Sequence, residues 1–218
     1  MKYYPAFLDI RGRRCVVVGG GDVAERKVSA LLDCGADVIV VGPLRSKGLA
    51  TLKAGGRIGH VDDEYRPDHL EGAFIVFGAT GSPEVNNRVA RDSRERGILV
   101  NIVDDPERCG FIVPAVLNRG SLTIAVSTAG KSPALARRIR EEMEGQFGGE
   151  YAVLVEIMGL LRKTVLAHGE DPDDNRKIFE RLLDAGLIEM IRQKRWDEAT
   201  DAILEITGER IEPWDEWR

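Results

Sequence analysis

The sequence is poor in the residues that cross-link small proteins or bind metals. Its 218 residues include three cysteines, Cys15, Cys34 and Cys109, and three histidines. An odd number of widely spaced cysteines argues against a disulfide framework, and neither residue type has the spacing of a zinc site. We therefore expect a protein of the reducing cytoplasm, and the sequence assigns no metal ligands.

Long apolar runs and an excess of positive charge are also lacking. No run of about 18 apolar residues is present to span a membrane, and residues 1–5 do not begin a signal peptide. The net charge of −5 makes nucleic acid an unexpected partner. With 43% hydrophobic and 31% charged residues, the composition is that of an ordinary soluble protein.

Glycine, in contrast, is concentrated where an apolar run ends. Residues 15–18 read as a strand, three glycines follow, and a helical pattern begins directly after them. Gly19-x-Gly21-x-x-Ala24 fits the dinucleotide fingerprint. Gly19 permits a tight turn, Gly21 lets the backbone approach a pyrophosphate, and Ala24 keeps the helix close to the sheet. The alternative is a glycine-rich turn that binds nothing.

One part of the fingerprint is missing. An acid is expected about 20 residues on, at the end of the second strand, to hold the ribose hydroxyls. The strand at 37–41 ends instead in Gly42-Pro43-Leu44-Arg45. Arg45 and Lys47 are basic and make binding of the 2′-phosphate of NADP possible, so these residues do not decide between NAD and NADP.

The first half of the chain alternates between strand and helix patterns, which predicts a doubly wound, Rossmann-like parallel sheet. The segment at 62–70 is polar and is expected to be a surface connection. The expected strands are 14–18, 37–41, 57–61, 74–78 and 98–103, and the expected helices are 24–34, 47–54 and 83–96.

The pattern changes in the second half. Runs at 111–117 and 121–127 predict a hairpin, a helix is expected at 133–146, and residues 150–208 read as helices. A lone hairpin is marginally stable, which favours a homodimer. The expected apolar stripes are Leu154, Ile157, Leu160, Leu161 and Val165, and Phe179, Leu182 and Leu183. The predicted domains are 1–113 (NAD-binding), 114–148 (dimerisation), 149–210 (helical) and 211–218 (tail).

Ligands of such sheets collect beyond the carboxyl ends of the strands. Thr80 follows the fourth strand, Asn101 lies in the fifth, and Asp104-Asp105 follows it. Adjacent side chains of an extended segment point to opposite sides, so one acid can face the nicotinamide end of a cofactor and the other solvent. The alternative is that both acids initiate the turn at Pro106.

A second candidate site is the loop from Ser127 to Pro133. It holds three hydroxyls, a glycine and Lys131 before a helix N-terminus, which suits an anionic group. The alternative is a plain capping loop. Arg137, Arg138 and Arg140 follow, either as carboxylate ligands or as a solvated face.

The remaining reactive side chains are expected to be structural. The scattered histidines, His60, His69 and His168, form no ligand set. Cys109 lies near Asp104 and could be a nucleophile, but no histidine is near it in sequence, which favours a buried or incidental thiol.

Four blocks of the sequence occur in a recognisable order: Val17 to Lys27, Ala79-Thr80 with Val85-Asn86, Val100 to Pro106, and Ser127 to Arg137. Together they resemble the precorrin-2 dehydrogenase and sirohydrochlorin ferrochelatase family, the N-terminal module of siroheme synthase. The likeness is strong over residues 3–145 and looser in the helical remainder.

The resemblance implies NAD-dependent oxidation of precorrin-2, a tetrapyrrole, to sirohydrochlorin in siroheme biosynthesis. It makes Asp104 the essential acid, adds Asp22, Val23, Pro43, Leu44, Ala79 and Thr80 to the cofactor contacts, and sets Ser127, Thr128, Lys131, Ser132 and Arg137 along the substrate cleft, with Asn101 nearby. It also implies a homodimer. The resemblance does not decide whether the protein inserts Fe²⁺ or Co²⁺ into sirohydrochlorin. Two alternative functions stay open, a non-catalytic regulator that binds NAD or tetrapyrrole and a different oxidoreductase on the same fold.

Overall fold

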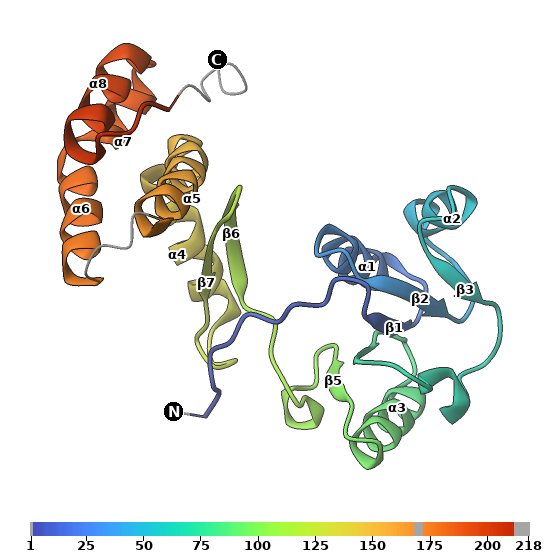
Figure 1. The fold of residues 1–218 in the computed structure, drawn as a ribbon. Helices are drawn as coiled ribbons and strands as arrows, with labels where there is room; N and C mark the ends of the chain where they lie inside the picture. The colour runs from blue at the N-terminus through green and yellow to red at the C-terminus, as the bar shows by residue number, and fades with distance from the viewer. Residues whose placement is uncertain (1, 168–171, 212–218) are drawn as a thin grey trace. The chain divides into compact units, whose positions relative to one another are not determined.

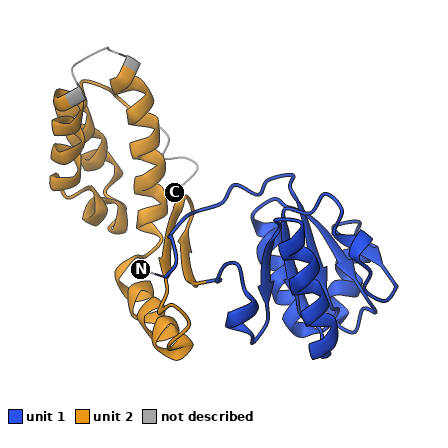
Figure 2. Ribbon diagram, turned by 90° about the horizontal axis from the view of Figure 1, so that it is seen from below, with its two compact units in different colours: residues 1–113 blue, residues 114–218 orange. Residues whose placement is uncertain are grey.

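The computed structural model describes residues 2–167 and 172–211. The chain divides into two compact units, residues 1–113 and 114–218 (Figure 1, Figure 2). Unit 1 contains a five-stranded sheet of order β3-β2-β1-β4-β5, in which every neighbouring pair is parallel. The strands are β1 (Arg14–Val18), β2 (Asp37–Val41), β3 (Gly59–Val61), β4 (Ile75–Gly78) and β5 (Leu99–Ile102). The predicted Rossmann-like sheet is confirmed.

Three helices connect the strands of unit 1: α1 (Asp22–Asp33), α2 (Lys47–Ala54) and α3 (Pro83–Glu95). Local chemistry sets their ends. The Ser82 hydroxyl accepts the Val85 N–H at 3.3 Å and Pro83 occupies the first turn, so α3 begins at the predicted residue, Pro83. Helix α1 begins at Asp22, two residues before the predicted start.

The sheet of unit 1 is covered on both faces. Alternate residues of β1 enter two separate clusters of buried apolar side chains. Cys15 and Val17 pack with Val28 of α1, whereas Val16 and Val18 share a cluster with Val89 of α3. Burial on both faces explains why the strands read as continuous apolar runs rather than alternating ones.

The segment at 62–70 lies at the surface, as its polarity predicts, but two of its side chains anchor it to the core. Tyr65 and Leu70 are buried, and residues 67–70 form a short 3₁₀ helix, η1 (Pro67–Leu70). The Tyr65 hydroxyl donates a 3.0 Å hydrogen bond to the carboxylate of buried Asp92 on α3. The segment therefore packs against α3 through contacts that local polarity could not reveal.

Unit 2 begins with an antiparallel hairpin, β6 (Ala115–Arg119) and β7 (Leu122–Val126), against which α4 (Pro133–Gln146) packs. The first hairpin strand starts four residues later than predicted, at Ala115 rather than Phe111. The preceding residues run along the edge of β5, where the Gly110 N–H donates to the Val100 carbonyl at 2.8 Å. Helix α4 has the predicted bounds.

The remaining helices are α5 (Glu150–Ala167), α6 (Pro172–Asp184), α7 (Leu187–Arg192) and α8 (Trp196–Thr207), and they share one apolar cluster. The predicted stripes were wrong at two positions, since Leu160 is 40% exposed and Leu183 is 58% exposed. Both lie just outside the buried faces of their helices. His168 and residues 212–218 of the predicted tail lie outside the described residues. No helix in the described part of the chain has the length and apolarity to cross a bilayer.

Candidate functional site

The candidate cofactor residues follow strands whose carboxyl ends meet at one edge of the sheet. Residues 19–21 follow β1, 43–44 follow β2, and 79–80 follow β4. The chain runs from β1 outward to β3 and then returns to place β4 beside β1. The glycine loop therefore lies at the point where the winding reverses, which is the crevice where open α/β sheets bind ligands.

The three glycines of this loop have different reasons to be glycine. Gly19 has φ +122°, and a Cβ there would lie 2.3 Å from the Ala79 carbonyl oxygen. A Cβ on Gly20 would lie 2.2 Å from the Pro43 carbonyl oxygen. A Cβ on Gly21 would meet no atom within 4 Å. Gly19 and Gly20 are thus required by the protein's own backbone, while the space over Gly21 is open.

That open space lies at the start of α1. Gly21 is the N-cap and provides no side-chain hydrogen bond to the helix, whose first turn begins with exposed Asp22 and half-buried Val23. Ala24 is fully buried, so α1 approaches the sheet closely. An uncapped helix N-terminus beside a space that a Cβ would narrow fits the pyrophosphate of a dinucleotide.

The loop after β2 is tied to the glycine loop. The Arg45 and Ser46 N–H groups donate to the Gly20 carbonyl at 2.8 and 3.0 Å. The Ser46 hydroxyl also donates to the Glu25 carboxylate, and Gly48 leaves the room that this carboxylate occupies. Sequence reasoning gave Glu25 no role, although it directly follows the last fingerprint residue, Ala24.

A hollow of about 470 Å³ lies beside this loop. Pro43 and Leu44 line it together with Lys53 of α2 and His60 of β3. In sheets of this kind the ribose lies at the end of the second strand. Pro43 and Leu44, which were predicted to contact the cofactor, therefore border a hollow at the position where such sheets bind the ribose.

The loop after β4 is held by a residue that sequence reasoning did not single out. The Asn86 amide oxygen accepts from the Thr80 hydroxyl at 2.8 Å and from the Thr80 N–H at 3.3 Å. The Asn86 amide nitrogen donates to the Thr80 carbonyl at 3.1 Å. These bonds fix the backbone of Ala79 and Thr80 against Gly19. Asn86 was visible in the sequence only as part of a matching block.

The two adjacent acids after β5 have different surroundings. Asp105 accepts the Arg108 N–H at 3.2 Å and pairs with the Arg108 guanidinium, so it caps the short helix η2 (Pro106–Arg108). Asp104 is exposed, and among the described residues its carboxylate has no hydrogen bond or ion pair. Its φ of +60° is unusual for a residue with a side chain. Of these two acids, Asp104 is therefore the one whose carboxylate is available to a ligand.

A lysine on α1 adds charge near Asp104. Lys27 is half-buried with its ammonium 5.5 Å from the centre of the Phe77 ring, and it makes no hydrogen bond or ion pair within the described residues. Burial lowers the pKa of Lys27, while the nearby Cys109 and Asp104 partly offset that effect. Lys27 is the last residue of the first matching block, Val17 to Lys27, but nothing in that block predicted this position.

Asn101 is buried inside unit 1. Its side-chain amide donates to the Phe111 carbonyl at 3.0 Å, so it braces the segment that follows the Asp104 loop. A contact between Asn101 and a substrate stays a prediction.

The loop at 127–133 belongs to unit 2, and its hydroxyls bond within the loop. Thr128 donates to the Ser132 carbonyl at 3.0 Å, the Ser127 hydroxyl accepts the Ala129 N–H at 3.1 Å, and the Ser132 hydroxyl accepts the Leu135 N–H at 3.2 Å. Lys131 is exposed, and its ammonium has no partner among the described residues. The capping alternative accounts for the hydroxyls but not for the lysine.

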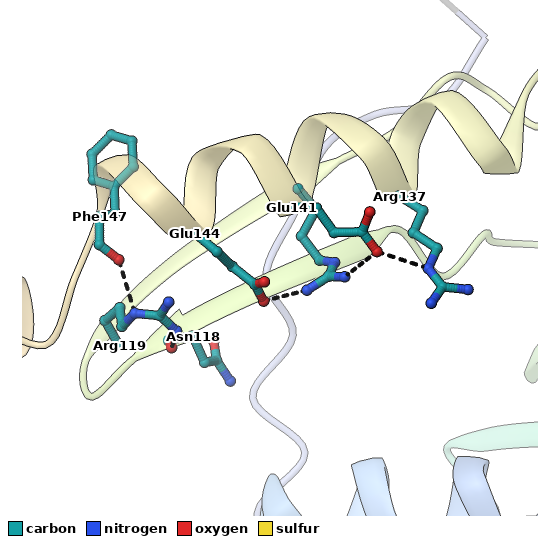
Figure 3. Close-up of polar contacts among 7 residues, drawn as sticks. Asn118, Arg119, Arg137, Glu141, Glu144 and Phe147 are labelled. Carbon is teal, nitrogen blue, oxygen red and sulfur yellow. Dashed lines mark hydrogen bonds and ion pairs between the residues drawn. The ribbon is translucent and has the colours of Figure 1, made fainter.

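The arginines of α4 form ion pairs within their own helix. Arg137 pairs with Glu141 at 3.0 Å, and the close-up shows the pair on the surface of the helix (Figure 3). Arg138 and Arg140 pair with Glu142 and Glu144 in the same spacing. The Arg137–Glu141 and Arg138–Glu142 pairs are exposed and contribute little stability, so a bound carboxylate can displace them at low cost.

The histidines within the described residues have structural partners. His60 Nε2 lies 2.9 Å from the Gly42 carbonyl oxygen, and His69 Nδ1 accepts the Arg66 N–H at 3.2 Å. Over residues 2–167 and 172–211, no three histidine, cysteine or acidic side chains gather closely enough to hold a metal ion. Insertion of Fe²⁺ or Co²⁺ stays a prediction.

Comparison with known proteins agrees with this geometry. Residues 6–115 match the family described as putative NAD(P)-binding, and residues 119–146 match the sirohaem biosynthesis protein central family. The chain is 35% identical over 207 residues to a siroheme synthase of Photobacterium profundum, covering 95% of this chain and 44% of that protein. It is 39% identical to one from Chromobacterium violaceum, covering 88% and 41%. The chain thus spans less than half the length of these relatives.

A solved structure matches over nearly the whole chain. SirC, a precorrin-2 dehydrogenase, superposes with a TM-score of 0.75 at 25% identity, covering 95% of this chain and all of that one. Its fold therefore includes counterparts of both units. The chain belongs to the siroheme synthase N-terminal family, in which a putative NAD(P)-binding domain precedes the sirohaem biosynthesis central segment.

Proposed function

We propose that this protein is an NAD-dependent dehydrogenase that oxidises precorrin-2 to sirohydrochlorin. The observation that carries the proposal is the open space over Gly21 at the same sheet edge as Asp104, whose carboxylate is unpaired within residues 2–167 and 172–211. The likeness to SirC over 95% of the chain supports the substrate.

In this proposal the chain holds and orients two molecules. Gly21 and the first amides of α1 bind the pyrophosphate, and the backbone of Pro43 and Leu44 contacts the adenosine half. Ala79 and Thr80, fixed by Asn86, border the other half. The nicotinamide ring, when bound, supplies the hydride acceptor.

Asp104 has the role of base in this reaction. Its ionised carboxylate accepts the proton that the macrocycle loses as the hydride departs. Lys27 contributes positive charge nearby. The exposed position of Asp104 at the end of β5 leaves it accessible to a large planar substrate.

Unit 2 is proposed to bind the carboxylates of the tetrapyrrole. Lys131 is the first candidate because its ammonium is exposed and unpaired within the described residues. Arg137 is the second candidate, and it binds a substrate carboxylate when that carboxylate replaces Glu141 in the ion pair. The hairpin and α4 also expose apolar side chains, with Val116 41% and Leu135 50% exposed, which supports a homodimer through residues 114–148. Light scattering in solution tests that assembly.

The choice of NAD over NADP is also part of the proposal. The end of β2 carries no acid, and the side chains of Arg45 and Lys47 are exposed there. These residues by themselves do not favour NAD, so the expectation of NAD rests on the family resemblance. Titrating the protein with both nucleotides under identical salt tests whether NAD binds more tightly.

The central experiment replaces Asp104 by asparagine. We expect Asp104→Asn to retain NAD binding and to lose precorrin-2 oxidation by about two to four orders of magnitude, because a positioned base contributes that much. The assay is anaerobic incubation with precorrin-2 and NAD, followed by absorbance. Asp105→Asn is the matched control, since its amide oxygen still accepts the Arg108 N–H. Unchanged turnover in Asp104→Asn would contradict the proposed role.

The same assay distinguishes the alternatives. A non-catalytic regulator binds NAD or tetrapyrrole without any change in absorbance of the macrocycle. A different oxidoreductase leaves precorrin-2 unchanged but reduces NAD with another substrate. Adding Fe²⁺ or Co²⁺ to the sirohydrochlorin product then tests metal insertion.

A further inference from the structure

The loop that carries Asp104 is held in an uncommon conformation. Asp104 has φ +60°, a region that residues with a Cβ rarely occupy. Such a conformation persists only where the surrounding contacts over-determine it. The Val103 N–H donates to the Gly78 carbonyl at 3.0 Å, and the Asp105 N–H donates to the Ile102 carbonyl at 3.3 Å. These two bonds flank Asp104 but do not tie the far end of the loop to the strand.

The thiol of Cys109 makes that connection. Its sulfur accepts the Ile102 N–H at 3.2 Å. Its single proton can be donated to the Ile102 carbonyl at 3.3 Å or to the Asp105 carbonyl at 3.2 Å. Because β5 is an edge strand, its outward amides have no neighbouring strand to bond. The sulfur takes the place of that neighbour for Ile102.

The residues on either side of Cys109 extend the same connection. The Asn101 amide nitrogen lies 3.5 Å from the sulfur and donates to the Phe111 carbonyl at 3.0 Å. The Gly110 N–H donates to the Val100 carbonyl at 2.8 Å. The sulfur therefore lies at the centre of contacts that close the loop from Ile102 to Gly110 against β5.

The protonation state of the thiol suits this role. Burial raises the pKa of Cys109, an effect that Asp105 increases and that Arg94, Lys27 and the Ile102 hydrogen bond oppose. The group is thus a thiol at neutral pH, able to donate as well as accept. A neutral thiol is a poor nucleophile, which argues against a covalent role.

We propose that Cys109 is a positioning residue, whose thiol closes the loop from Ile102 to Gly110 and thereby presents the Asp104 carboxylate for proton transfer. The inference rests on the proposed function insofar as Asp104 is the base. Cys109 itself touches neither cofactor nor substrate in this account.

The test compares Cys109→Ala and Cys109→Ser with Cys34→Ala. Cys34 is an exposed free thiol at the end of α1 and serves as the matched control. We expect Cys109→Ala to lower kcat by on the order of tenfold to a hundredfold, since a misplaced catalytic group costs that much. KM and NAD affinity stay close to wild type. Cys109→Ser recovers part of the loss because its hydroxyl also donates and accepts.

A double variant separates positioning from general damage. In an Asp104→Asn background, Cys109→Ala should cause no further loss of kcat, because the group that it positions is already absent. An equal loss in both backgrounds overturns the proposal, as does wild-type kcat in folded Cys109→Ala. If Cys109→Ala fails to fold, Cys109→Ser carries the same comparison.

Amide hydrogen exchange tests the loop without any activity. Residues 102–110 should exchange faster in Cys109→Ala than in wild type or Cys34→Ala, with the rest of unit 1 unchanged. Faster local exchange in a protein that does not oxidise precorrin-2 would reject the proposed function while supporting closure of the loop by Cys109. Unchanged exchange would overturn the positioning role itself.

Discussion

Replacing Gly20 by alanine puts a methyl carbon 2.2 Å from the Pro43 carbonyl oxygen and 3.0 Å from the Leu44 Cα. Non-bonded carbon atoms prefer about 3.5–4.0 Å, so the loop must move by roughly 1 Å. Both obstructing atoms are backbone. The Arg45 and Ser46 N–H groups are bonded to the Gly20 carbonyl itself, at 2.8 and 3.0 Å. The loop therefore cannot withdraw without stretching those bonds.

The magnitude follows from these two contributions. Forcing an extra methyl into a packed site costs about 1–3 kcal/mol. Losing one of the two hydrogen bonds adds about 1 kcal/mol. We expect the free energy of unfolding of Gly20→Ala to fall by about 2–4 kcal/mol, against a total of about 5–15 kcal/mol for a typical domain.

Urea denaturation followed by circular dichroism measures this change. With a slope of about 2 kcal/mol per molar urea, the midpoint of Gly20→Ala should fall by about 1–2 M. Gly21→Ala is the matched control, because a Cβ there meets nothing within 4 Å. Its midpoint should stay near wild type, while its affinity for NAD falls because the methyl group narrows the space proposed for the pyrophosphate.

Two results would refute the reasoning. If Gly20→Ala unfolds at the wild-type urea concentration, the contact with Pro43 does not constrain the loop. If Gly21→Ala is as destabilising as Gly20→Ala, the space over Gly21 is not open. Wild-type NAD affinity in a folded Gly21→Ala protein would instead count against the position proposed for the cofactor.

Two further predictions concern stability. Burial raises the pKa of Cys15 from 9.0 to about 11, so its stabilising contribution is complete below pH 9 and is lost as the pH rises to 11. The loss amounts to about 3 kcal/mol, and Cys15→Ala should flatten the fall of the urea midpoint over that range, whereas an equal fall in both proteins would contradict it. Tyr65→Phe removes the 3.0 Å hydrogen bond to Asp92 and should lower the free energy of unfolding by about 1.5–3 kcal/mol, measured by urea unfolding. A midpoint equal to wild type would show that the hydroxyl does not stabilise the fold.

Much of the fold was predictable because its signals are local. Apolar runs that alternate with helical patterns along the chain predicted the parallel sheet. The predicted first residues of α3 and α4, Pro83 and Pro133, are confirmed, and each follows a capping serine. These signals depend on residues within one turn or one strand of each other. Distant contacts decided what these local signals did not predict, namely the burial of Tyr65 against Asp92 and the later start of β6 at Ala115.

The sequence by itself determined which residues were candidates, since Gly19, Gly21 and Asp104 stood out by motif and position. Only the tertiary structure showed which of these residues and their sequence neighbours are held by contacts with distant segments, and which have an available side chain or an open space beside them. It brought Pro43 against Gly20 and Ala79 against Gly19, and it committed Asp105 to a helix cap while leaving Asp104 unpaired within the described residues. Motif and propensity report the chemistry of adjacent residues, whereas the availability of a side chain depends on segments that folding brings together from elsewhere in the chain.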